Sequence, residues 1–289
     1  MPDGSLLAVD RSLFSVVNSE IVQMYHHEHC KTGQIGVVAV LKHKPTGKRL
    51  IVATTHLAFN PYRGDWKLKQ SIHLIAEITK QIELSGDSRN AFQEIHFRTT
   101  SQNRKMVIRI FWKTHESIPV IICGDLNSLP NSIIISYFAN RETELFDIPS
   151  QRLSGQTLPK FDYYRKKHGI PGNTLIDSTK LEYCGLSKES KYLDENQSQA
   201  VFEDLIDGNS NPNNNFILSK SMAFKSAYQN AEKATSCVGN GQSDCVDYIF
   251  YSPDILVSGR LEQPDELSEL PDEIHGSDHL PLAIDFSFA

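Results

Sequence analysis

The stretch Ile118-Pro-Val-Ile-Ile-Cys-Gly-Asp-Leu-Asn-Ser128 runs from an apolar segment into a polar one. Ile118–Cys123 is continuously apolar, which is typical of a strand that is buried on both faces of a sheet. Beyond Gly124, the residues Asp125 and Asn127 occupy alternate positions, and in an extended chain such side chains point the same way. The sequence therefore predicts a strand end that presents a carboxylate and an amide together.

That pair of side chains suits phosphoryl chemistry. A carboxylate orients or deprotonates water, and an amide binds a phosphate oxygen or a metal ion. Gly, Asp, Asn and Ser are also the usual residues of turns, so the composition of this stretch alone fits a plain turn at least as well.

Other short runs rich in β-branched and aromatic residues also predict strands. The polar, turn-rich link His43–Lys48 predicts that the strands on either side of it, Val37–Leu41 and Leu50–Thr54, form an antiparallel hairpin with a fairly long loop. The predicted strands are Val37–Leu41, Leu50–Thr54, Val246–Tyr251 and Leu282–Phe288.

One clear helix is expected from about Asp65 to Leu84. Its period predicts an apolar face, with Lys67, Lys69 and Glu77 left for solvent. Strands and a helix in one domain, with hairpins among the strands, predict an α+β fold with a largely antiparallel or mixed sheet. The apolar residues that recur at intervals of three and four are Leu68, Ile72, Ile75, Ile78 and Ile82.

The chain reads as one domain over residues 1–289, interrupted by polar insertions near 85–116 and 187–215. Its net charge is −6, so no overall basic field draws it onto nucleic acid, although a basic cleft can sit on an acidic protein. The five scattered cysteines form no CxxC pair, and no apolar run approaches the roughly 18 residues of a membrane span. We expect a soluble intracellular protein of the cytoplasm, with no membrane contact.

Two motifs near the C-terminus add candidate site residues. Gly276-Ser-Asp-His279 places Asp278, a hard ligand suited to Mg²⁺, beside His279, which can protonate or stabilise a phosphoryl oxygen. Asp247 interrupts an apolar strand, and a histidine held by this carboxylate would be a suitable partner. A loop explains the first motif and a strand-edge aspartate near solvent explains the second about equally well.

His56 ends a strand in Ala53-Thr-Thr-His-Leu57. A lone histidine at a strand end is more often structural than catalytic. The order in which these four motifs follow one another along the chain is stronger evidence for a functional site than any one motif alone.

The order Thr-His-Leu, Gly-Asp-Leu-Asn, Asp-Tyr-Ile-Phe and Ser-Asp-His resembles the endonuclease/exonuclease/phosphatase superfamily. Within it, the chain is most similar to the deadenylase-type branch that includes nocturnin, and there to the Angel subfamily. The resemblance implies a four-layer α/β/β/α sandwich of the DNase I-like type. The segments that carry it in most detail are Thr54–Gln70, Leu153-Ser-Gly-Gln156, Gly259-Arg-Leu-Glu262 and Ser277-Asp-His-Leu-Pro281.

The resemblance also implies a role for each motif residue. Asp125 would position or activate the attacking water and, with Asp278, hold Mg²⁺ or Mn²⁺. His279, oriented by Asp247, would stabilise charge on the phosphoryl group. Asn127 and His56 would contact phosphate oxygens. Because they follow closely after His56, Arg63 and Lys67 are also expected to face a phosphate backbone, and Trp66 and Tyr62 to stack on bases.

The chain departs from the family pattern at its start. The family's first strand ends in an Asn, and a metal-binding Glu follows on the next strand. Neither motif occurs here, and Met1-Pro-Asp-Gly-Ser5 resembles a segment that lies downstream of both in Angel proteins. We therefore expect an N-terminally truncated domain with weakened Mg²⁺ binding and some uncovered apolar surface.

These features predict a Mg²⁺-dependent phosphoester hydrolase that acts on RNA 3′ ends, as a poly(A) 3′-exonuclease or a 2′,3′-cyclic phosphate phosphatase. RNA is the expected partner. One alternative is a catalytically inactive, RNA-associated scaffold, and another is a phosphatase for inositol phosphates or dinucleotides.

Two other clusters contain residue types that suit binding of a metal ion or of phosphate. His26-His-Glu-His-Cys30 has zinc-ligand residue types, but adjacent positions do not converge on one ion in regular structure. The basic groups at Lys42–Arg49 and Arg165–His168 suit RNA phosphates, although such groups are more often solvated surface.

Overall fold

The computed structural model describes residues 4–27, 30–61, 63–85, 118–145, 153–156, 216–228, 237–239, 242–264 and 270–289. Most of the two predicted insertions lies outside these ranges, as do Glu28 and His29 of the possible zinc motif, Tyr62 and the basic group 165–168. None of the described helices is long and apolar enough to cross a membrane.

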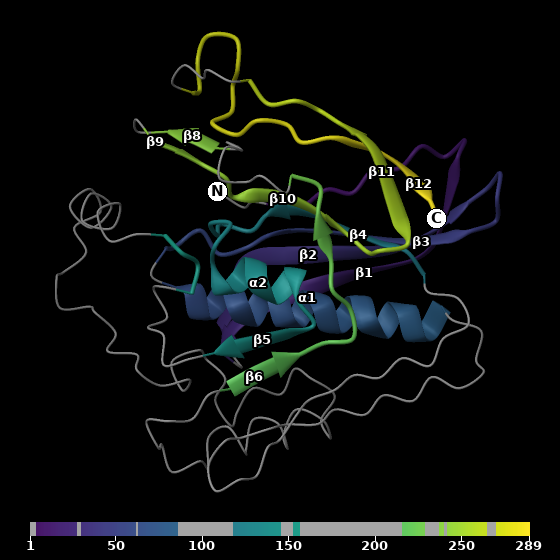
Figure 1. Cartoon of the computed structure of the whole chain (residues 1–289), viewed down its shortest axis with the longest axis horizontal. Coiled ribbons are helices and arrows are strands. Elements are labelled where there is room, and N and C mark those ends of the chain that lie inside the picture. The colour runs from purple at the N-terminus through teal and green to yellow at the C-terminus, as the bar shows by residue number, and fades with distance from the viewer. Residues whose placement is uncertain are drawn as a thin grey trace, which may run out of the picture.

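A six-stranded mixed sheet organises the fold (Figure 1). The β3–β4 pair is parallel and the other pairs are antiparallel, and the predicted hairpin is confirmed as β2–β3. In spatial order the strands are β1 (Phe14–His27), β2 (Cys30–His43), β3 (Arg49–His56), β4 (Val120–Asp125), β10 (Asp247–Tyr251) and β7 (Lys225–Ser226).

Two helices cover one face of this sheet. The predicted helix is confirmed as α1 (Gly64–Ser85), and the shorter α2 (Ile133–Ala139) lies beside it in Figure 1. Both contribute to the larger apolar core, in which Phe138 of α2 stacks on Phe250 of β10 with ring centroids 5.3 Å apart. The helices therefore hold the same sheet that carries the candidate site.

The opposite face of the sheet is covered by the antiparallel pair β11 (Ile255–Arg260) and β12 (Ile284–Phe288). The described residues therefore form three of the four predicted layers: the helices, the six-stranded sheet and the β11–β12 pair. On the same face, the outer strand β1 leaves Val16 53% and Ile21 62% exposed. Two small antiparallel strand pairs complete the described elements, β5 (Glu142–Leu145) with β6 (Phe216–Ser219), and β8 (Cys237–Gly239) with β9 (Gln242–Asp244).

The expectation that Lys67 and Lys69 face solvent is wrong. Lys67 is 0% exposed and Lys69 is 2% exposed. Glu77 is half-buried and pairs with Lys80 at 3.2 Å. The prediction failed because the start of α1 is enclosed on more than its apolar side, and the Lys67 ammonium finds its hydrogen-bond acceptors inside the protein.

Candidate active site

Three adjacent strands bring the candidate site together. β3 ends at His56, β4 ends at Asp125 and β10 begins at Asp247. The register pairs His56 with Asp125 across the parallel ladder and Asp247 with Asp125 across the antiparallel ladder. Because directly paired residues lie on the same face of a sheet, these side chains meet at one sheet edge.

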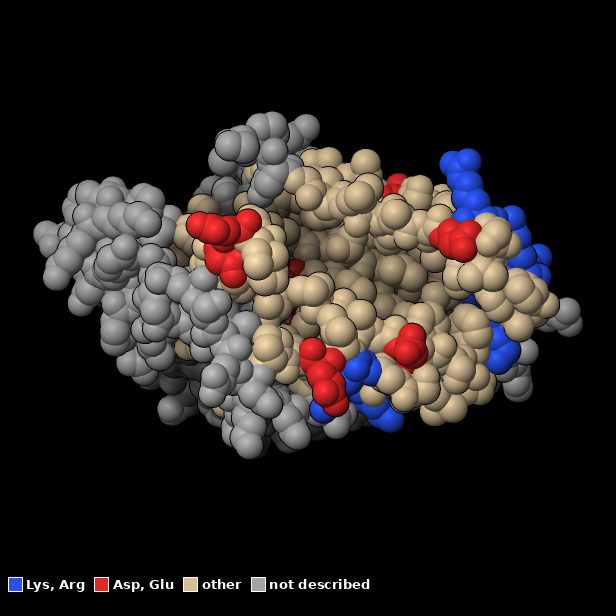
Figure 2. All heavy atoms as spheres, turned by 90° about the horizontal axis from the view of Figure 1, so that it is seen from above, with Lys and Arg blue, Asp and Glu red and all other residues tan. Residues whose placement is uncertain are grey.

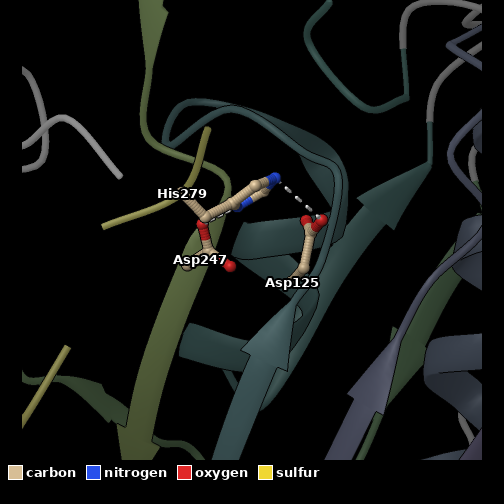
Figure 3. Close-up of side chains that lie close together, drawn as sticks. All are labelled: Asp125, Asp247 and His279. Carbon is tan, nitrogen blue, oxygen red and sulfur yellow. Dashed lines mark hydrogen bonds and ion pairs between the residues drawn. The ribbon is translucent and has the colours of Figure 1, made fainter. Parts of the chain in front are cut away.

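Asp125 lies at the centre of this group. His56 Nε2 is 3.3 Å from Asp125 Oδ2. His279 reaches the edge from the segment before β12, where its Nδ1 lies 2.8 Å from Asp247 Oδ2 and its Nε2 lies 4.0 Å from Asp125 Oδ2 (Figure 3). An ionised carboxylate only accepts hydrogen bonds, so Nδ1 carries the proton and Nε2 faces Asp125. The structure thus brings these four predicted residues together.

Burial is the main cause, and the nearby charge of Asp247 the second cause, of the rise in the pKa of Asp125 from 3.8 to about 6. The backbone N–H of Asn127 and the two histidines oppose this shift. A carboxyl group with this pKa is poised between its protonated and ionised forms near neutral pH, which suits a group that exchanges protons with water.

The chemistry of the cluster fits a divalent cation. Asp125, Asp247 and His279 each place a potential ligand atom within 4.8 Å of the others. A cation between the two carboxylates would relieve the repulsion that raises the pKa of Asp125. Carboxylate oxygens are the ligands that Mg²⁺ and Mn²⁺ prefer.

Asp278 does not belong to this cluster. Its side chain is exposed, although the next residue, His279, is turned toward Asp247. A metal-binding role for Asp278 remains a prediction.

Asn127 does not follow the expected extended chain, in which its side chain would point the same way as that of Asp125. Its φ is 46°, so the chain leaves the extended conformation after Asp125. The backbone N–H of Asn127 donates to Asp125 Oδ1 at 2.7 Å, and its side-chain amide donates to Leu57 O at 3.0 Å and to Asp125 Oδ2 at 3.3 Å. The amide is buried against the protein, and its contact with a phosphate oxygen remains a prediction.

Gly124 is required where β3 and β4 approach each other next to the site. Its φ is +145°, and a Cβ atom there would lie 2.0 Å from Thr55 O. The glycine in Gly-Asp-Leu-Asn therefore permits the strand pairing that sets His56 beside Asp125.

Arg63 and Trp66 lie at the start of α1, after the chain has passed His56. The Arg63 guanidinium carbon is 3.6 Å from the centroid of the Trp66 ring. One face of the indole is therefore covered by a cation, and the stacking of Trp66 on a base remains a prediction. Neither residue is part of the carboxylate and histidine cluster.

The basic residues Lys42, Lys44, Lys48 and Arg49 are exposed at the opposite end of β3 from His56. Lys42 and Arg49 pair at the start of the β2–β3 ladder, whereas the site lies where β3 ends. Figure 2 shows Lys and Arg along its right-hand end, with a smaller group at the lower centre, around a hollow in the middle of this face. This basic group is therefore separated from the candidate site by the length of a strand.

Tyr248 is a residue of the site region that the sequence patterns did not single out. Its hydroxyl lies 2.7 Å from Ser128 O and 3.1 Å from Cys245 O, so it ties β10 to the Asp125–Ser128 loop. The sequence could have indicated this role, because Tyr248 occupies a predicted buried strand and a buried tyrosine hydroxyl needs a hydrogen-bond partner.

Comparison with known proteins places this geometry in a family. The protein-family model described as "Endonuclease/Exonuclease/phosphatase family" matches residues 95–279, which include Asp125, Asp247 and His279. The chain belongs to this family. The match begins after His56, so the placement of His56 in the site is supported by its pairing with Asp125 across β3 and β4.

Several relatives match nearly the whole chain. Protein angel homolog 2 of Danio rerio is 24% identical over 99% of this chain and 49% of its own length. Its counterpart from Bos taurus is 26% identical over 99% and 53%. The CCR4-Not complex 3′-5′-exoribonuclease subunit Ccr4 of Yarrowia lipolytica is 26% identical over 88% of this chain and 28% of its own length. The chain spans about half the length of the angel relatives it matches.

The crystal structure of ANGEL2, a 2′,3′-cyclic phosphatase, in complex with adenosine-2′,3′-vanadate shares this fold. The similarity has a TM-score of 0.61 at 24% identity and covers 96% of this chain and 68% of that one. The expected α+β, DNase I-like architecture is thereby confirmed.

Proposed function

We propose that this protein is a metal-dependent phosphoester hydrolase that acts on RNA 3′ ends. The observation that carries the proposal is the meeting of His56, Asp125, Asp247 and His279 at one sheet edge. Membership of the endonuclease/exonuclease/phosphatase family supports the reaction class. The activities described for the ANGEL2 and Ccr4 relatives support the substrate class.

The side chains divide the chemistry among them. Asp125 accepts a proton from, or orients, the attacking water, because its carboxyl group is buried and has a pKa of about 6. Asp247 holds His279 through Nδ1, so that Nε2 is directed at the reacting group. His56, beside Asp125, is placed to contact a phosphoryl oxygen.

Asp125 and Asp247, with His279 next to them, would hold the divalent cation, Mg²⁺ or Mn²⁺. When bound, such an ion supplies charge neutralisation at the phosphoryl group, which is the main demand of phosphoester cleavage.

Among RNA ends, the 2′,3′-cyclic phosphate is the first substrate we propose. The angel relatives match 99% of the chain, and the solved ANGEL2 is described as a 2′,3′-cyclic phosphatase. The Ccr4 relative is described as a 3′-5′ exoribonuclease and makes poly(A) the second candidate.

The test offers the 289-residue chain, with Mg²⁺ or Mn²⁺, two RNAs of identical sequence. Both end in a poly(A) tail, which carries a 2′,3′-cyclic phosphate in one RNA and a free 3′-hydroxyl group in the other, and a dinucleotide is added as competitor. We expect cation-dependent turnover of the cyclic end that Asp125→Ala abolishes and Asp10→Ala, a distant exposed aspartate, leaves intact.

Each outcome separates the candidates. Equal turnover by wild type and Asp125→Ala would remove Asp125 from the mechanism. Preference for the dinucleotide would favour a small-molecule phosphatase. RNA binding without turnover under any condition would identify an inactive scaffold.

A further inference from the structure

Lys67, buried in α1, contacts the Asp125–Ser128 loop from behind. It is 0% exposed, and its Nζ donates to Asn127 O at 2.7 Å and to Gln156 Oε1 at 2.8 Å. Full burial keeps this ammonium group from a substrate phosphate. Any influence on the reaction therefore passes through the residues that Lys67 holds.

Asn127 transmits that hold to Asp125. Its backbone has φ 46°, a conformation that a non-glycine residue keeps only when its surroundings enforce it. Lys67 donates a hydrogen bond to the carbonyl group of Asn127. The backbone N–H and the side-chain amide of Asn127 in turn donate to the two carboxylate oxygens of Asp125, at 2.7 and 3.3 Å. The orientation of the Asp125 carboxylate is thus linked to the Lys67 ammonium group through one residue.

Gln156 belongs to a segment fixed beside the same loop. Leu129 N donates to Ser154 O at 2.8 Å, so the chain that leaves the loop is bound to the segment that holds Gln156. Gly155 has φ +72°, and a Cβ atom there would lie 3.2 Å from the side chains of both Leu129 and Ser132. The Leu153-Ser-Gly-Gln156 motif therefore delivers a fixed acceptor to Lys67.

The same helix also holds the chain that follows His56. One turn beyond Lys67, Gln70 Oε1 accepts a hydrogen bond from Ala58 N at 2.8 Å. The start of α1 is thus a common support for the two segments that carry His56 and Asp125.

We propose that Lys67 and Gln156 are positioning residues for Asp125, acting through Asn127. This inference rests on the proposed function, and it assigns a task to the buried polar residues behind the site. Their loss misplaces the carboxylate and lowers turnover without removing any group that touches the substrate.

The test compares Lys67→Met and Gln156→Leu with the matched control Lys220→Met in the 289-residue chain. Lys220 is also buried, and its ammonium donates to backbone carbonyls, including Asn140 O at 2.7 Å, at the far end of α2. All three changes remove buried hydrogen bonds, but only the first two touch the support of the loop. Gln156→Glu keeps an acceptor for Lys67 and serves as the rescuing variant.

We expect kcat to fall about 10- to 100-fold in Lys67→Met and Gln156→Leu, with KM changed less than about twofold, as for other groups that orient catalytic residues. Lys220→Met and Gln156→Glu should keep kcat near the wild-type value. Equal kcat in Lys67→Met and Lys220→Met would overturn the inference.

An NMR measurement separates this inference from the proposed function. The backbone amide signal of Asn127 should shift in Lys67→Met and stay in place in Lys220→Met, whether or not a substrate is turned over. A wild-type chain without turnover would refute the proposed function alone, whereas an unmoved Asn127 signal would refute the positioning role.

Discussion

Gly124 shows how one missing side chain permits the site. Replacing it with alanine places a Cβ atom 2.0 Å from Thr55 O at a φ of +145°, so β3 and β4 must separate where His56 and Asp125 pair. We expect Gly124→Ala to cost at least about 2 kcal/mol of unfolding free energy and to abolish turnover. Thermal unfolding and the RNA assay measure both effects.

Gly47 provides the control for that substitution. It also has positive φ, +73°, but nothing lies within 4 Å of its would-be Cβ atom. Gly47→Ala should cost only about 1 kcal/mol and keep turnover. Similar losses in both variants would show that conformation, and not the contact with Thr55, determines the requirement at Gly124.

Asp125 is also a source of instability in metal-free protein. Its pKa rises from 3.8 to about 6 on folding, so the folded state binds the proton more tightly than the unfolded state. The free energy of unfolding should therefore fall as pH rises from about 4 to about 6 and remain lower above that range.

Asp125→Asn should consequently unfold at a higher temperature than wild type in metal-free buffer at pH 7.5, with the difference much reduced at pH 4. Melting curves at both pH values in the presence of a chelator measure this. A destabilised variant at pH 7.5 would show that the hydrogen bonds accepted by the ionised carboxylate outweigh its burial and repulsion.

At the scale of elements, Tyr228 fastens the loop that carries His279. Its hydroxyl lies 3.0 Å from both Leu261 O and Ala283 O, and it accepts from Ala283 N at 3.2 Å. Tyr228→Phe should cost about 1–2 kcal/mol, lower kcat and speed hydrogen exchange at the Ala283 amide. Tyr251→Phe is the control, because the Tyr251 hydroxyl has no hydrogen-bond partner among the described residues. Unchanged exchange at Ala283 in Tyr228→Phe would contradict this role.

Elements were predictable from the sequence where one local pattern sufficed. The apolar run before Gly124 predicted β4, and the apolar spacing in 65–84 predicted α1 within a residue at each end. The 14-residue β1 was missed, since polar and apolar residues do not alternate cleanly along it and its pairing with β2 shifts register. Lys67 was misplaced because its acceptors, Asn127 and Gln156, come from distant parts of the sequence.

At the scale of the whole molecule, the candidate site depends on strand register. The sequence predicted His56 and Asp125 at strand ends and Asp247 inside an apolar strand, but only the order β3–β4–β10 makes these positions adjacent. The left-handed turn at Asn127 was equally hidden, because Asn tolerates both extended and left-handed conformations. Motif order could therefore name the residues of the site, while non-local pairing determined their contacts.

The whole molecule should also gain stability from a divalent cation. Asp125 and Asp247 repel each other in the folded state, and an ion that binds there favours folding by mass action. At about 100 times its dissociation constant the gain is about 2.7 kcal/mol, which corresponds to a rise of roughly 4–5 °C in Tm. Melting curves with Mn²⁺ or Mg²⁺ against a chelator measure this rise.

Protons compete with the ion for Asp125, so the cation-dependent rise in Tm should be larger at pH 8 than at pH 5. Asp125→Ala should lose the rise, whereas Asp278→Ala should keep most of it, because Asp278 lies outside the cluster of ligand atoms. The same rise in Asp125→Ala as in wild type would place the ion elsewhere. A rise lost in Asp278→Ala would mean that the exposed aspartate turns inward when the ion binds.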